Sequence, residues 1–374
     1  MHRYMIGTLA ILTFWATGAC AAPAPDPLVR SVPVPGGVAD ADGKIGYVVN
    51  DKGGINALDL ESGKILWTHD GPARPLVAFD KKLAIQVPVK DKQNQVRIEI
   101  LDTAAKGKRL RESDAVVFPD WASTGLMHGR SFASSASVQG GTLYLKWEAH
   151  ASYAGGAPPT EEILKAAKKD ADGVAAVSLE SGKVELLGKD KEPKVDELKL
   201  SDELAKITSQ QYFTGSDWVQ RPIIVGGTLA ALSQENATDG KIKLTLKRWD
   251  IATGKAKDSV ELITGKELFL IVPGGGTHLF VHQALPKDKL PDGDYAWWIF
   301  SLETGKSVGK IAFEQTMELV VVGPRVLYAV NGAGKGLPPG TFEQPRTLKA
   351  VDLKSGKALW ESPLEPIKTL PPLP

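Results

Sequence analysis

The sequence is poor in cysteine and carries almost no net charge. Among 374 residues there is one cysteine, Cys20, so no disulfide bond can form within one molecule. Lysine and arginine number 45 against 44 acidic residues, which excludes recruitment of nucleic acid by bulk charge. No apolar run reaches the roughly 20 residues that a transmembrane helix needs. The rest, 43% hydrophobic and 24% charged, is the composition of a globular protein with ample material for a core.

The first residues are typical of an export signal. Arg3 supplies a positive end, residues 5–16 form an uncharged and mostly apolar run, and residues 17–22 are small. We therefore expect a signal peptide over 1–20 and an exported protein of the bacterial periplasm or envelope. Two alternatives remain open. Cys20 stands where a lipoprotein signal places its acylated residue and is the candidate for lipidation, whereas ordinary cleavage would follow Ala21. A lipid on Cys20 would be the protein's only attachment to a membrane.

A short turn motif recurs along the chain: Asp or Ser, an apolar residue, any residue, Ser or Thr, Gly and Lys. Copies lie at residues 59–64, 178–183, 250–255, 301–306 and 352–357, and a degraded copy spans 102–108. The glycine suits a tight turn between antiparallel strands, and the Asp and hydroxyl side chains can accept hydrogen bonds from its backbone. We expect structural roles, in these turns or in the strands that follow them, for Asp59, Gly63, Trp67, Gly182, Gly254, Gly305, Asp352, Gly356 and Trp360.

A second signal precedes each copy, namely an apolar strand, a turn and another apolar strand. These segments lie at residues 39–49, 78–87, 138–147, 224–233, 271–282 and 321–330. Four antiparallel strands repeated along a chain are the signature of a β-propeller. The fold class predicted is therefore all-β, a β-propeller with six four-stranded blades. A seventh blade stays open if residues 110–137 hide a degenerate unit.

Irregular spacing indicates insertions. Successive turn motifs start 43, 76, 72, 51 and 51 residues apart, so two intervals exceed the roughly 40–50 residues of a blade. Residues 158–170 and 194–211 are each predicted to contain a short helix, the first with acids near its start and lysines near its end. The predicted organisation is a signal over 1–20, a Pro-rich linker over 21–35, the propeller over 36–365 and a Pro-rich tail over 366–374.

The segments GGINALDLESGKILW and TLKAVDLKSGKALW resemble the repeats of the PQQ-like (quinoprotein-type) β-propeller superfamily. In that family a tryptophan four residues after the turn glycine packs between neighbouring blades, and Trp67 and Trp360 stand at this position. The other four copies depart from the pattern, with Arg111, Leu186, Asp258 and Gly309 there. The resemblance also implies seven or eight blades, more than the six counted.

What the resemblance implies for function depends on the branch. Quinoprotein dehydrogenases use PQQ, a calcium or lanthanide ion, a catalytic aspartate and often adjacent cysteines. We find no residues here that match such a site, and the chain is closer to the non-enzymatic envelope branch, which includes the lipoprotein propeller of the β-barrel assembly machinery. We expect a monomeric, non-catalytic module that binds a protein partner in the envelope, without a cofactor. The alternative is a PQQ-dependent dehydrogenase or another envelope enzyme that uses the propeller channel.

No other residues form a convincing site. His278 and His282 share a strand face but would lie about 13 Å apart, too far for one metal ion. The glycine-rich segments 274–276 and 332–336 lack the spacing of a phosphate-binding loop. We therefore predict no catalytic, cofactor-binding or metal-binding residues. The irregular insertion over 150–171 is the segment where we first expect a binding surface, because loops more often carry partner specificity than blades do.

Overall fold

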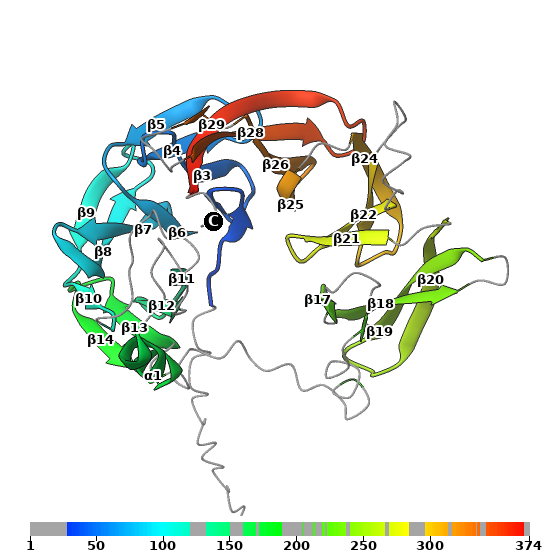
Figure 1. Ribbon diagram of the computed structural model, residues 1–374, viewed down its shortest axis with the longest axis horizontal. Helices are drawn as coiled ribbons and strands as arrows, with labels where there is room; N and C mark the ends of the chain where they lie inside the picture. Colours follow the sequence, from blue (N-terminus) through cyan, green and yellow to red (C-terminus); the bar gives the residue numbers. More distant parts are fainter. Residues whose placement is uncertain are drawn as a thin grey trace, which may run out of the picture.

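The computed structural model describes residues 28–119, 132–149, 160–169, 172–188, 204, 212–213, 219–220, 223–236, 240–265, 269–283, 296–312, 316–333, 335–336 and 342–369. Within these residues the chain is nearly all-β, with one short helix and six antiparallel sheets of four or five strands each. The sheets follow one another around a common centre in the order of the sequence, and in this view the third and fourth sheets stand apart (Figure 1). The fold is a β-propeller, as the repeats predict.

The first three sheets come from the N-terminal half. The first contains β1 (Val32–Val34), β2 (Gly37–Ala39), β3 (Ile45–Val49), β4 (Ile55–Asp59) and β5 (Ile65–His69). The second contains β6 (Arg74–Phe79), β7 (Lys82–Val89) and β8 (Lys92–Asp102), and β9 (Lys108–Glu112) and β10 (Val116–Val117) both pair with β8. The third contains β11 (Phe132–Gln139), β12 (Thr142–Ala149), β13 (Asp172–Ser178) and β14 (Val184–Leu187).

The other three sheets come from the C-terminal half, and a separate hairpin of β15 (Tyr212–Phe213) and β16 (Val219–Gln220) precedes them. The fourth contains β17 (Ile223–Val225), β18 (Thr228–Asn236), β19 (Ile242–Asp250) and β20 (Ala256–Gly265). The fifth contains β21 (Phe269–Gly274), β22 (His278–Gln283), β23 (Ala296–Ser301) and β24 (Ser307–Ala312). The sixth contains β25 (Thr316–Val322), β26 (Arg325–Asn331), β27 (Lys335–Gly336), β28 (Phe342–Asp352) and β29 (Ala358–Thr369).

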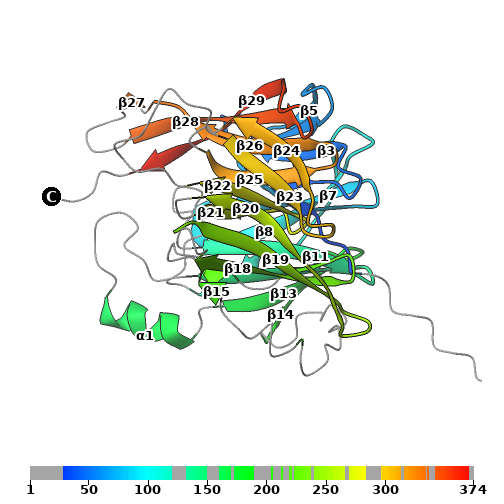
Figure 2. The same cartoon turned by 90° about the vertical axis from the view of Figure 1, so that its right-hand side faces the viewer.

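Helix α1 (Glu161–Lys169) lies between the second and third strands of the third sheet. It falls within the helix predicted for residues 158–170, has Glu161 and Glu162 in its first turn, and stands apart from the sheets (Figure 2). The second predicted helical insertion, 194–211, lies outside the described residues apart from Leu204. In the described parts of 110–137, every strand belongs to the second or third sheet, so the residues that the structure describes form six blades. No helix among the described residues is both long and apolar enough to span a bilayer.

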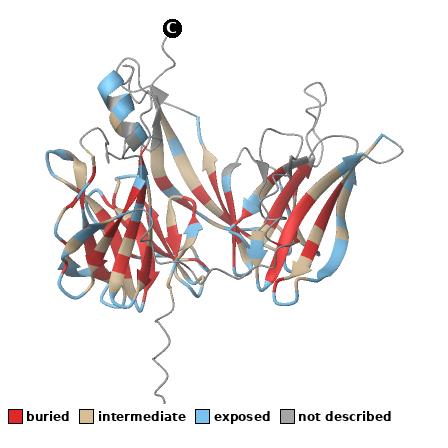
Figure 3. Ribbon diagram, turned by 90° about the horizontal axis from the view of Figure 1, so that it is seen from below, coloured by how far each residue is buried: buried red, intermediate tan, exposed pale blue. Residues whose placement is uncertain are grey.

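The core lies between neighbouring sheets, where buried residues fill the faces that meet (Figure 3). Separate clusters of buried side chains join the first sheet to the second, the second to the third, the fourth to the fifth, the fifth to the sixth, and the sixth back to the first. This arrangement follows from strand alternation, which sends apolar side chains to both faces of each blade. The innermost strand of each sheet therefore presents its edge to the centre of the ring.

The chain enters the fold earlier than the predicted boundary. Strand β1 lies inside the segment predicted as linker, 21–35, because Val32 and Val34 pack against the core shared by the first and sixth sheets. Val29 pairs with Val138 of β11 through two backbone hydrogen bonds, of 2.8 and 3.0 Å. At the other end, β29 continues to Thr369, beyond the predicted boundary at 365.

Candidate functional site

The repeated turns join neighbouring outer strands of their sheets, namely β4 to β5, β8 to β9, β13 to β14, β19 to β20, β23 to β24 and β28 to β29. At the first copy, Oδ1 of Asp59 accepts hydrogen bonds from the backbone N–H and the hydroxyl of Ser62, at 2.7 and 3.0 Å. Gly63 adopts a φ of 71°, in the left-handed region that favours glycine. The copies at residues 250–255 and 352–357 repeat this geometry through Asp250 and Asp352. The predicted glycines Gly182, Gly254, Gly305 and Gly356 all have positive φ as well.

We call Asp59, Asp250 and Asp352 the turn aspartates. Hydrogen bonds from the backbone and hydroxyl of the Ser or Thr three residues further on lower the pKa of all three carboxyl groups. Each carboxylate thereby caps N–H groups that the turn leaves unpaired. These acids lie in separate blades, so they do not form a common site.

Trp360 and Trp67 each cover the turn glycine of the next blade. The indole N–H of Trp360, in the sixth sheet, donates a hydrogen bond of 3.0 Å to the carbonyl of Leu60 in the first sheet. A Cβ on Gly63 would come within 2.5 Å of the Trp360 ring, and a Cβ on Gly107 within 2.7 Å of the Trp67 ring. The first and last motif copies thus meet where the ring closes, and the indoles lock adjacent sheets together.

The predicted lipidation residue, Cys20, lies outside the described residues. His278 and His282 both lie on β22, and burial lowers the pKa of each imidazole. His282 packs beside Trp297, with ring centroids 5.4 Å apart. These two histidines are therefore part of the packing of the fifth sheet.

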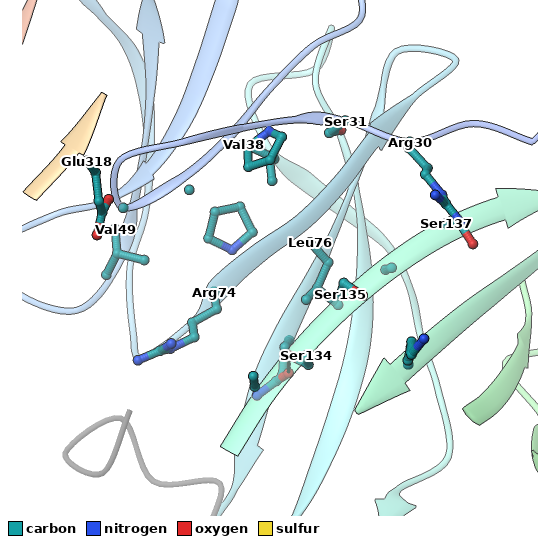
Figure 4. Close-up of a pocket in the computed structure, with 18 of the residues that line it drawn as sticks. Arg30, Ser31, Val38, Val49, Arg74, Leu76, Ser134, Ser135, Ser137 and Glu318 are labelled. Carbon is teal, nitrogen blue, oxygen red and sulfur yellow. Dashed lines mark hydrogen bonds between the residues drawn. The ribbon is translucent and has the colours of Figure 1, made fainter. Parts of the chain in front are cut away.

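The site that emerges from the structure is a central cavity of about 810 Å³, a size typical of ligand pockets. Its walls are formed by strands of the first, second, third and sixth sheets and by the segment that precedes β1 (Figure 4). The residues that carry charge or hydroxyl groups into this lining are Arg30, Ser31, Arg74, Ser134, Ser135, Ser137, Tyr144, Lys146, Glu318, Arg346 and Glu365.

Positive charge prevails in this cavity. Four basic side chains face two acidic ones, Glu318 and Glu365. Arg346 pairs with Glu318 at 3.2 Å, but its Nε atom is buried and has no hydrogen-bond partner among the described residues. The side chain of Arg74, at the first residue of β6, makes no hydrogen bond or ion pair within the described part of the chain. A cavity lined by the Arg74 side chain and by an unpartnered buried donor of Arg346 favours an anionic group.

Two hydroxyl groups of the lining stabilise the cavity wall. Ser31 Oγ accepts a hydrogen bond of 2.7 Å from the backbone N–H of Ala78 on β6. Ser134 Oγ donates one of 2.9 Å to the side chain of Gln86 on β7. These bonds join the entering segment and the third sheet to the second sheet, so they hold the wall of the cavity in a fixed arrangement.

Sequence reasoning missed every residue of this cavity. Its charged residues come from β6, β12, β25, β28, β29 and the segment before β1, and they follow no common spacing. The only usable signal was Arg74, a charged residue at the start of an inner strand that is otherwise buried.

The described residues do not fit a metal–quinone centre of the kind that the enzymatic branch of the resemblance implies. Among the described residues, no three His, Cys, Asp or Glu side chains form a cluster that could hold a metal ion. In the cavity, Glu318 already pairs with Arg346, and the surrounding basic side chains disfavour a divalent cation.

Comparisons with known proteins identify no family. No protein-family model matches the chain, and no curated protein does. Among solved structures, the Dos1 propeller is similar at 12% identity and a TM-score of 0.22, over 92% of this chain and 70% of that one. KlAtg21, in complex with the coiled coil of AgAtg16, is similar at 10% identity and a TM-score of 0.22, over 86% of this chain and 82% of that one. Cobalt-substituted apocarotenoid oxygenase of Synechocystis is similar at 11% identity and a TM-score of 0.28, over 88% of this chain and 73% of that one. Likeness at this level carries no argument about function, and the fold assignment rests on the six sheets themselves.

Proposed function

We propose that this chain is an exported, non-catalytic β-propeller of the PQQ-like type that works as a protein-binding module in the bacterial cell envelope. The single observation that carries the binding role is the central cavity. Four sheets contribute to its walls, and its polar groups converge on one space of about 810 Å³. The export signal supports the envelope location, and the neutral balance of charge supports a protein partner over nucleic acid.

Site-specific photocrosslinking tests whether the cavity is the binding surface. A photoreactive amino acid replaces Ser135, an exposed residue of the cavity lining, and in a matched variant it replaces Leu66, which is 45% exposed on the outer strand β5. We expect a discrete crosslinked partner in envelope extracts from position 135 only. Crosslinking from position 66 alone would place binding on the outer rim and contradict the proposal.

Two further measurements test the remaining parts. Addition of PQQ and calcium to the purified protein should give no bound chromophore and no dye-linked alcohol oxidation, and a clear signal of either kind would overturn the non-catalytic role. Labelling of cells with a fatty acid, with Cys20→Ala as the control, separates the two alternatives for the N-terminus. Label that depends on Cys20 means a lipid anchor, and its absence means release after Ala21.

A further inference from the structure

Strand β11 has a free backbone edge on the side opposite its partner strand β12. Val138 uses its backbone N–H and C=O to bond Val29, so these groups point away from the partner strand β12. Hydrogen bonding alternates along an antiparallel pair, and the register of β11 with β12 is regular. Ala136 and Ser134 must therefore also direct their N–H and C=O groups to the free edge.

From Ala136 to Ser134, where β11 lines the cavity, its free edge has no partner strand among the described residues. After pairing at Val29, the entering segment moves to β6, where Ser31 bonds the backbone of Ala78. No backbone group of the described residues pairs with the free edge at Ala136 or Ser134, and both residues line the cavity. An unpaired strand edge is a template for an added strand. Residues 28–30 already show how such a strand starts on β11.

The charged residues near this edge determine which extended segments the cavity favours. Arg74 lies on β6, beside β11, and Figure 4 shows Arg74 and Ser134 on neighbouring strands. Arg346 adds the buried Nε atom that has no described partner. An acidic side chain on an added strand would be attracted by these two arginines, whereas a basic one would be repelled.

Building on the binding role proposed above, we infer that the central cavity binds an extended acidic segment of the partner protein. The segment adds as a short strand to the edge of β11 at Ala136 and Ser134. It places carboxylates against Arg74 and Arg346. The backbone bonds supply affinity, and the basic side chains supply the preference for acidic sequences.

Three labelled peptides test the inference on the full mature chain by fluorescence anisotropy. The first alternates glutamate and valine, the second replaces each glutamate with glutamine, and the third is the first with alternate backbone amides N-methylated. We expect the first to bind about tenfold or more tightly than the second, the effect of losing a charge-assisted hydrogen bond. N-methylation should abolish binding because it removes the donors that pair with the strand edge.

Variants of the protein locate the site. Arg74→Gln should weaken binding of the glutamate peptide about tenfold. Arg111→Gln, the same change at an exposed position of the outer strand β9, should leave it unchanged. Thermal unfolding of both variants checks that the fold is retained. Equal binding by Arg74→Gln and the unchanged protein would overturn the inference.

The outcomes separate failure of this inference from failure of the proposed function. If citrate binds and the glutamate peptide does not, the cavity takes a small anion and the strand-addition model is wrong. If position 135 crosslinks a partner while the glutamate and glutamine peptides bind equally, the binding module stands and its acidic specificity falls. Absence of both the crosslink and peptide binding would overturn both.

Discussion

The contact between Gly63 and Trp360 leads to a prediction whose backbone and packing parts can be measured separately. Gly63 and Gly227 have nearly equal φ angles, 71° and 72°. A Cβ at Gly63 would lie 2.5 Å from Cγ of Trp360, whereas a Cβ at Gly227 would meet nothing within 4 Å. Gly227→Ala should therefore cost only the backbone strain of an alanine in the left-handed region, about 1–2 kcal/mol of unfolding free energy.

Gly63→Ala should cost more because it also displaces the indole of Trp360. Truncation of a buried aromatic residue costs about 3–5 kcal/mol, and we take about 2 kcal/mol for the partly buried Trp360. Loss of the hydrogen bond from its N–H to the carbonyl of Leu60 adds about 1 kcal/mol. The total for Gly63→Ala is then about 4–5 kcal/mol, and Trp360→Ala alone should cost about 3 kcal/mol.

A double-mutant cycle gives the decisive measurement. In the Trp360→Ala background, Gly63→Ala should cost no more than Gly227→Ala, because the clash has gone. Urea unfolding followed by far-UV circular dichroism supplies the four free energies, and unchanged m-values confirm a common unfolded state. Equal losses for Gly63→Ala and Gly227→Ala, or additive losses in the cycle, would refute the role of Trp360 as the residue that locks the sixth sheet to the first.

Three further predictions concern other parts of the ring. Trp67→Ala should lower the unfolding free energy by about 3–5 kcal/mol, since Trp67 is 9% exposed, while Leu66→Ala, beside it and 45% exposed, should change it little in the same urea assay. The pKa values of the turn aspartates are lower in the folded chain than in the unfolded one. Their contribution to the unfolding free energy is therefore present above about pH 4 and is lost as the pH falls through the pKa values of the folded chain. Replacing all three with asparagine should make the midpoint of urea unfolding depend less on pH in the acid range. Equal dependence of the midpoint on pH in the variant and the unchanged protein would contradict this. The buried Arg248 donates hydrogen bonds from two nitrogens to the carboxylate of Asp258 and from a third to the backbone carbonyl of Glu303 in the next sheet. Arg248→Ala should lower the unfolding free energy, measured by thermal unfolding, by about 2 kcal/mol, and Arg248→Lys should restore only part of that loss. Full restoration by lysine would contradict a bidentate role for Arg248.

The sequence was sufficient for the architecture because the signals of this fold are local. Each blade is a run of hairpins between residues close in sequence, so the turn glycines and the strand alternation report directly on the structure. The six inner hairpins at residues 39–49, 78–87, 138–147, 224–233, 271–282 and 321–330 were predicted correctly. Helix α1 was recognisable for the same reason, because its charges are ordered along the segment itself.

The cavity could not be predicted because it depends on contacts that the sequence does not order. Arg74 and Arg346 reach one space only after the ring has formed. The edge of β11 also depends on a distant segment, since the pairing of Val29 with Val138 fixes which backbone groups face the centre. A proline-rich stretch near the N-terminus suggested a linker, and tertiary packing of β1 overrode that local composition.

The way the ring closes has a consequence for how the protein folds. Each of the six main sheets is built from one continuous stretch of chain, and none borrows a strand from the opposite terminus. Nearly all strand pairing is therefore local and can form quickly, while the hydrogen bond from Trp360 to Leu60 spans 300 positions. We expect the blades to form first and the junction of the sixth sheet with the first to form last. Side-chain packing and this one hydrogen bond hold the two ends of the chain together, and among the described residues no strand pairing joins the sixth sheet to the first.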